Sequence, residues 1–255
     1  MTDPPIRIGL MGYGRMGKAI EKLAEDRGFA VDWVWKVGSK DATALTEAEM
    51  QEAEVVIEFT RPESAMPNFQ KLLKAGIPVV TGTTGWFEQM DKLEKLVAYN
   101  QGCFFHAANF SKGVNLFFAL NTYLARLLDQ QGFEPSITEV HHTGKKDAPS
   151  GTAIRLAEQI LKASSEWNRW ALKQGETANL EEDVISIRAE RRDPVPGTHR
   201  IVWEGPNDQI SIEHEARSRD GFAEGALAAA FWLAEQKSQG AQGIFTMSDM
   251  LRIEY

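Results

Sequence analysis

Hydrophobic and polar positions give the first 110 residues a regular alternation of two element types. Short apolar runs that predict buried strands lie at 6–11, 30–38, 54–60, 76–81 and 102–105. Stretches with helical spacing lie between them, at 18–24, 64–75 and 87–99. Alternation of strand and helix predicts a doubly wound, mostly parallel sheet of the Rossmann type, which is an α/β fold.

The pattern changes after residue 110. An apolar helix is predicted at 114–128, and three runs at 184–189, 198–203 and 209–216 alternate like strands without long helices between them. An apolar helix returns at 223–236, and we expect the C-terminal part to pack on the first sheet. The predicted domains are therefore 1–110 with 220–255, and an α+β domain at 111–219 with a mixed or antiparallel sheet. The polar stretch 164–181 is predicted to be a surface loop or helix.

A glycine-rich loop follows the first predicted strand directly. It reads Gly12-Tyr13-Gly14-Arg15-Met16-Gly17 and leads into a predicted helix. This is the G-x-G-x-x-G pattern in the strand–loop–helix context that dinucleotide binding requires. A glycine-rich turn in another α/β fold is the alternative.

Other residues at predicted strand ends bear on the same cofactor. Lys36, Ser39 and Lys40 follow the second strand where NAD-preferring domains place an acid, so NADPH is favoured, or loose discrimination that also admits NADH. The alternative is that both lysines point to solvent. Gly82, Thr83 and Thr84, and then Ala108, Asn109 and Phe110, follow two further strands and are predicted to line the nicotinamide-ribose site, although Gly82–Gly85 alone is equally typical of a structural turn.

The stretch 139–153 gathers the groups most suited to catalysis. His141 and His142 are adjacent, Lys145 follows closely, and Ser150 or Asp147 is placed to cap an apolar-periodic helix. Backbone amides at the start of that helix, near Gly151 and Thr152, form a seat for an anion. The alternative is a solvated polar loop with a helix cap.

Composition and charge narrow the class of protein. A net charge of −8 argues against nucleic-acid binding, and no run approaches the length of a membrane span. One cysteine, Cys103, excludes an internal disulfide, and with no secretory signal at the N-terminus it indicates the cytoplasm. No metal is expected, because the two histidines are adjacent and no cysteine or carboxylate cluster completes a shell.

The stretch E-x-H-x-x-x-K-x-D-x-P-S-G-T-A from Glu139 to Ala153 resembles the dihydrodipicolinate reductase family. The glycine loop, the Gly82–Gly85 turn and residues 107–111 are similar to that family too, so the resemblance spans nearly the whole chain. It implies NAD(P)H-dependent reduction of 4-hydroxy-tetrahydrodipicolinate, a cyclic dicarboxylate, in lysine biosynthesis by a homotetramer. It also implies that His141 donates the proton with help from Lys145, and that His142, Gly151 and Thr152 contact the substrate carboxylates.

Two features depart from the family pattern, and two other functions stay open. Ser136 replaces an acid, and Arg192-Asp193 stands where Arg-x-Gly is usual. Another two-domain nicotinamide dehydrogenase, for example of the aspartate type, shares the glycine loop but has no need of the 139–153 constellation. A non-enzymatic nicotinamide-binding sensor would tolerate the loss of His141 and Lys145, and both are present.

Overall fold

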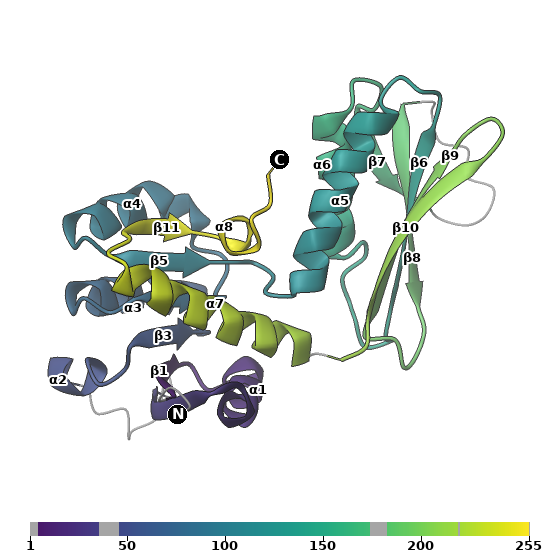
Figure 1. The fold of residues 1–255 in the computed structure, drawn as a ribbon. Coiled ribbons are helices and arrows are strands. Elements are labelled where there is room, and N and C mark those ends of the chain that lie inside the picture. Colours follow the sequence, from purple (N-terminus) through teal and green to yellow (C-terminus); the bar gives the residue numbers. More distant parts are fainter. Residues whose placement is uncertain (1–4, 36–45, 174–182, 219, 255) are drawn as a thin grey trace. The chain divides into compact units, whose positions relative to one another are not determined.

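The computed structural model describes residues 5–35, 46–173, 183–218 and 220–254 (Figure 1). The chain divides into two compact units. Unit 1 contains residues 1–112 and 220–252, and unit 2 contains residues 113–219 and 253–255. Each unit has its own buried apolar clusters.

Unit 1 is built on a six-stranded sheet in the order β11-β5-β4-β3-β1-β2. All of its strand pairs are parallel, which confirms the predicted Rossmann-type sheet. The strands are β1 (Ile6–Met11), β2 (Phe29–Trp35), β3 (Val55–Glu58), β4 (Val79–Thr81), β5 (Cys103–His106) and β11 (Gly243–Phe245).

Alternating side chains of these strands fill two separate cores. Leu10 and Ile57 lie in one core with α1 (Arg15–Ala24) and α7 (Asp220–Ser238). Val56 and Phe104 lie in the other with α3 (Pro62–Lys74) and α4 (Met90–Tyr99). Both faces are buried because successive strand residues point to opposite sides, which explains why the strands read as unbroken apolar runs. Shorter elements are η1 (Glu25–Arg27), α2 (Glu47–Met50), η2 (Phe87–Gln89) and α8 (Met247–Leu251).

The C-terminal segment returns to the first sheet, as expected. Strand β11 pairs with β5, and α7 packs on the core beside β3 and β5. Gly225 allows the close approach of α7, because a Cβ there would lie 1.8 Å from the carbonyl oxygen of Phe110. Among the described residues, no helix is long and apolar enough to cross a membrane.

Unit 2 contains a mixed sheet in the order β10-β9-β6-β8-β7. The central strand β6 (Glu134–His141) pairs parallel with β8 (Val184–Arg191) and antiparallel with β9 (Gly197–Glu204). The outer strands are β7 (Arg169–Leu172) and β10 (Gln209–Ala216). Helices α5 (Lys112–Leu128) and α6 (Gly151–Ala163) share one apolar core with the sheet, so one face of the sheet is buried.

The prediction for residues 164–181 is wrong in part. Residues Arg169–Leu172 form strand β7, which pairs parallel with β8, and Trp167 and Trp170 pack against the core of unit 2. A run of four residues is too short for an alternation of apolar and polar side chains to be recognised within a polar stretch, so the sequence gave no strand signal. Residues 174–182 lie outside the described part of the chain.

Candidate active site

The carboxyl ends of four strands of unit 1 are aligned in one row. The pairing register places Met11, Glu58, Thr81 and His106 side by side across β1, β3, β4 and β5. The glycine loop, Thr60, Gly82–Gly85 and Ala107–Phe110 all follow this row. Since ligands of parallel α/β sheets lie beyond the carboxyl ends of the strands, the structure brings the predicted cofactor residues to one edge.

The glycines of the loop fit a dinucleotide. Gly12 has a φ of +99°, and a Cβ on it would lie 2.1 Å from the carbonyl oxygen of Phe59. A Cβ on Gly17 would lie 2.4 Å from the carbonyl oxygen of Gly12, whereas nothing lies within 4 Å of the Cβ position of Gly14. Gly12 and Gly17 are therefore needed for packing, and Gly14 leaves the open approach that a pyrophosphate requires.

The remaining predicted cofactor residues differ in exposure. Arg15, Thr84 and Ala108 are exposed, while Tyr13, Met16 and Asn109 are partly covered. Thr83 is buried, and so is Phe110, whose ring stacks on Phe105 in the core. Phe110 therefore presents only its backbone to a ligand. Lys36, like Ser39 and Lys40, lies outside the described residues.

In unit 2, Glu139 and His141 form a buried pair at the end of β6. Glu139 Oε2 lies 2.6 Å from His141 Nδ1, and the side chains are 0% and 11% exposed. The contact lacks hydrogen-bond geometry, and neither atom has another hydrogen-bond partner among the described residues. Both side chains come from strand β6, so the sheet fixes their backbone.

Arg191 on β8 neutralises the buried carboxylate and ties the following loop to it. Arg191 Nη2 donates to Glu139 Oε1 at 3.0 Å and to the carbonyl oxygen of Asp147 at 2.5 Å, and Arg191 Nε donates to the carbonyl oxygen of Lys145 at 3.3 Å. Burial alone would raise the pKa of Glu139, but contacts with His141, Ser150 and Arg191 outweigh it and lower the pKa to about 2. Glu139 is thus an anion throughout the physiological range.

His199 on β9 completes this group of side chains. Its ring packs edge-on against the ring of His141, with centroids 5.1 Å apart, and its Nε2 lies 3.0 Å from Ser150 Oγ. Burial, with repulsion from His141, lowers the pKa of His199 to about 3, so this imidazole is neutral at neutral pH. Ser150 also caps α6 by accepting from the amide of Ala153, which connects His199 to the helix start.

The depressed pKa of His199 predicts a pH dependence of stability. The unfolded chain takes up a proton at this imidazole below about pH 6.5, whereas the folded chain does so only near pH 3, so stability falls as pH falls through this window. Between pH 7 and pH 5 the loss from this group is about 2 kcal/mol. Urea unfolding of His199→Gln should show a loss in the free energy of unfolding between pH 7 and pH 5 that is smaller than in wild type by that amount. An equal loss in variant and wild type would contradict the depressed pKa of His199.

The loop after β6 presents Lys145 and His142. Lys145 Nζ lies 2.6 Å from Asp147 Oδ2, and the lysine side chain is 21% exposed. Thr143 anchors the loop by donating from its amide and its hydroxyl to Asp193, at 3.1 and 2.5 Å. Asp193 belongs to the Arg192-Asp193 pair that departs from the family pattern, and here its carboxylate holds the loop. His142 is partly buried beside Gly144.

The start of α6 has the predicted form. Ser150 is the N-cap, Gly151 is exposed and Thr152 is partly exposed. Within the described part of the chain, the amides of Gly151 and Thr152 have no acceptor, as expected for the first turn of a helix. Unpaired amides at a helix start suit an anion, and the anion site at Gly151 and Thr152 stays a prediction.

The residues Glu139, His141 and His199 also bear on metal binding. One ligand atom from each lies within 4.8 Å of the others, against about 3.4 Å between ligands in a tetrahedral zinc shell. The sequence predicted no metal because no carboxylate cluster completes a shell around the histidines. That premise is wrong, because Glu139 and His199 lie beside His141. Arg191 already balances the charge of Glu139, so the arrangement suits proton handling, and the absence of a metal stays a prediction.

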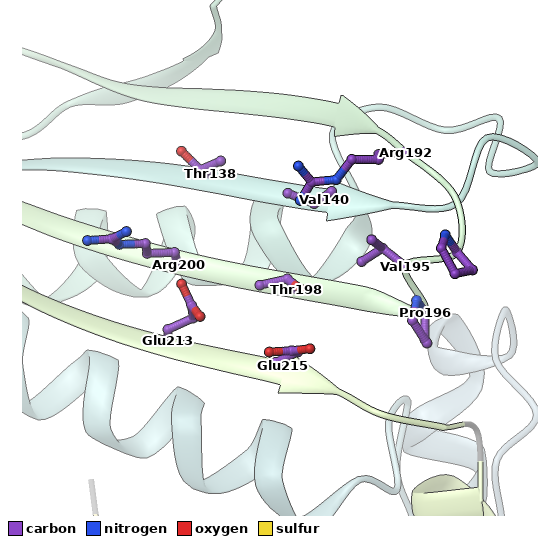
Figure 2. A pocket seen from close by; sticks show the side chains of 10 residues that line it. Thr138, Val140, Arg192, Val195, Pro196, Thr198, Arg200, Glu213 and Glu215 are labelled. Atoms are coloured by element: carbon purple, nitrogen blue, oxygen red, sulfur yellow. The ribbon is translucent and has the colours of Figure 1, made fainter.

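A cavity of about 370 Å³ lies on the other face of the unit 2 sheet (Figure 2). Thr138 and Val140 line it, and they alternate along β6 with Glu139 and His141. Because successive residues of a strand point to opposite faces, the cavity is separate from the histidine cluster. Arg200 and Glu213 are cross-strand partners within it. The cavity therefore belongs to the open face of the sheet, not to the predicted chemistry.

Three residues of the cluster around His141 were given no role from the sequence. Glu139 was used only as part of the motif, and Arg191 and His199 were not singled out. Alternation carried a signal for two of them, since Glu139 shares an inward face with Ile137, and His199 shares one with Ile201. A charged or imidazole side chain at a core-facing position needs a partner.

Comparison with known proteins shows which sequence family the chain matches. Sequence models described as dihydrodipicolinate reductase, N-terminus, and dihydrodipicolinate reductase, C-terminus, match residues 6–110 and 113–251. A protein of Christiangramia forsetii named 4-hydroxy-tetrahydrodipicolinate reductase is 41% identical over 249 residues, which cover 96% of this chain and 98% of that protein. One of the same name from Lawsonia intracellularis is 35% identical, covering 93% and 96%.

A solved structure shares the fold. Dipicolinate-bound dihydrodipicolinate reductase from Paenisporosarcina sp. TG-14 superposes with a TM-score of 0.72 at 22% identity, covering 95% of this chain and 97% of that one. At this identity the match supports the fold, and the residues above carry the chemistry.

Proposed function

The chain belongs to the dihydrodipicolinate reductase family, and from this premise we propose a role in the reaction for each residue of the site. It is an NAD(P)H-dependent oxidoreductase that reduces 4-hydroxy-tetrahydrodipicolinate, through dihydrodipicolinate, to tetrahydrodipicolinate in the diaminopimelate route to lysine. The observation that carries the proposed roles is the pairing of His141 with a buried, ionised Glu139.

His141 is the proton donor in this proposal. Reduction of a conjugated cyclic imine needs a hydride at one atom and a proton at its neighbour. The negative charge of Glu139, 2.6 Å from Nδ1, favours a proton on that nitrogen. On the other side, Gly197 leaves room at Nε2, since a Cβ on that residue would lie 3.0 Å from it. We therefore assign the transferred proton to Nε2.

Lys145 and the start of α6 hold the charges of the substrate. The ammonium of Lys145 stabilises the negative charge that develops as the ring accepts the hydride. The amides of Gly151 and Thr152, the Thr152 hydroxyl and His142 bind the carboxylates. Arg191 contributes by binding the backbone of Lys145 and Asp147, which keeps the loop in place.

The cofactor is held at the strand-end edge of unit 1. Gly12–Gly17, Gly82–Thr84 and Ala108–Phe110 are the proposed contacts, and the open position at Gly14 fits a pyrophosphate. When bound, the nicotinamide supplies the hydride. We propose use of both NADPH and NADH with a preference for NADPH, on the strength of Lys36, Ser39 and Lys40 in the sequence.

The open sheet face of unit 2 is the proposed assembly surface. Homotetramers built through this sheet are usual in the family, and the face carries Arg192 and Arg200 with Glu213 and Glu215, charges that complement each other between copies. We propose a cytoplasmic homotetramer. Light scattering that gave the mass of one chain would contradict it.

Calorimetric titration with pyridine-2,6-dicarboxylate tests the carboxylate site. Wild type should bind this planar dicarboxylate, more tightly when NADPH is present. Thr152→Val keeps the backbone amide but loses the hydroxyl, so its Kd should rise about fivefold, and the KM for substrate should rise more than kcat falls. Thr246→Val, which removes a hydroxyl at the start of α8 in unit 1, is the matched control. Equal affinities of Thr152→Val and the control would remove Thr152 from the site.

A further inference from the structure

A second buried carboxylate lies in unit 1, where the proposed mechanism does not use it. Glu58 ends β3 and has no exposed surface. It accepts hydrogen bonds from Thr60 Oγ1, from Thr81 Oγ1 at 2.6 Å and from Asn68 Nδ2 at 3.3 Å. Within the described ranges, no cation forms an ion pair with it. Burying a carboxylate that only neutral groups satisfy is costly, so its presence calls for a role beyond packing.

The carboxylate fixes the direction of the hydrogen bonds around it. The hydroxyls of Thr60 and Thr81 both donate to the carboxylate oxygens of Glu58. Their lone pairs then face other donors. Thr81 Oγ1 accepts from the amide of Thr83 at 3.1 Å, and Thr60 Oγ1 accepts from Asn68 Nδ2 at 3.2 Å. Glu58 thereby sets the polarity of the whole network.

The network joins two loops at the strand-end edge. The amide of Thr60, after β3, donates to Thr83 Oγ1 at 2.8 Å, and the indole of Trp86 donates to the carbonyl oxygen of Thr83 at 2.6 Å. Thr83 is thus held through its amide, its hydroxyl and its carbonyl group. The amide of Gly82 also donates to the carbonyl oxygen of Glu58, at 3.0 Å.

We propose that Glu58 is a positioning residue for the cofactor, because it locks the loop Gly82–Gly85 against the loop after β3 in the geometry that the nicotinamide-ribose half of NAD(P)H requires. This inference rests on the proposed cofactor site at Gly82–Thr84. Glu58 does not touch the reacting atoms, so its loss affects cofactor affinity and leaves the chemical step unchanged.

Glu58→Gln tests the proposal at nearly constant volume. The side-chain amide of Gln would donate to the hydroxyl of Thr60 or of Thr81, which now donates to Glu58. That hydroxyl would have to rotate, which disturbs the hydrogen bond that it accepts from Asn68 or from the amide of Thr83. The Kd of NADPH, from quenching of protein fluorescence, should rise about tenfold, while kcat at saturating NADPH and the KM for substrate stay within about twofold of wild type. Glu94→Gln, an exposed change on α4, should match wild type throughout.

Three outcomes separate the possible readings. Wild type that binds no NADPH would refute the proposed function. If wild type binds NADPH and Glu58→Gln binds it with the same Kd, the positioning role of Glu58 is refuted. A lower Tm of that variant would then show that Glu58 is a structural residue. Should Glu58→Gln not fold, Thr81→Val and Thr81→Ser decide. The valine variant should weaken NADPH binding and the serine variant should restore it, and equal affinities would overturn the proposal.

Discussion

Replacement of His141 by Gln will lower kcat by about 10²- to 10⁴-fold while the Kd of NADPH stays near that of wild type, because proton transfer from a positioned acid contributes that much to the rate. Gln fills a similar volume but has no acidic proton. Burial raises the pKa of the neighbouring Glu139, but its contacts with Ser150 and Arg191, which lower that pKa, remain in the variant, so Glu139 is a poor substitute for the imidazole as a proton donor.

Stopped-flow and steady-state measurements of NADPH oxidation test this expectation. Lys92→Gln, an exposed change on α4 of unit 1, is a suitable control. It should keep wild-type kcat. Weakened NADPH binding with intact turnover in His141→Gln would refute the proton-donor role and favour a different chemistry.

Replacement of Arg191 by Met should lower the free energy of unfolding by about 3–5 kcal/mol, the cost of leaving a buried charge unpaired. Glu139 is fully buried, and Arg191 is its cationic partner on β8. The same change releases the carbonyl oxygens of Lys145 and Asp147, so we also expect a fall in kcat. Urea unfolding near neutral pH measures the first effect.

A double-mutant cycle with Glu139→Gln separates charge from packing. Once the carboxylate is neutral, the loss of Arg191 should cost much less than in the wild-type background, so the two changes should be strongly non-additive. A loss below about 1 kcal/mol for Arg191→Met alone, or simple additivity, would show that the pair contributes little.

Most helices and strands were predictable because their apolar side chains recur with a regular spacing along the sequence. Apolar runs such as Ile6–Met11 gave the parallel strands, and the glycine loop between β1 and α1 gave the cofactor edge. Strands β6, β7 and β11 were not predicted. Strands β7 and β11 are short and take their order from pairing with β8 and β5, and the inward face of β6 carries Glu139 and His141 in place of apolar residues. Pairing between distant segments leaves no local signal.

The site was predictable only where its residues are close together in the sequence. His141, Lys145, Gly151 and Thr152 lie within one motif. Arg191 and His199 reach His141 only because β8 and β9 flank β6 in the sheet, an order that hydrophobic spacing does not specify. The hydrogen bond between Thr81 and Glu58 arises in the same way, from the register of β3 and β4.

The most direct test is to supply purified wild-type protein with 4-hydroxy-tetrahydrodipicolinate, generated in place by the preceding enzyme of the pathway, and to follow the absorbance of NADPH and NADH in parallel. We expect oxidation of one nicotinamide per tetrahydrodipicolinate formed, faster with NADPH. No oxidation of either cofactor above the rate without substrate, by folded protein that binds both, would contradict it and favour a sensor.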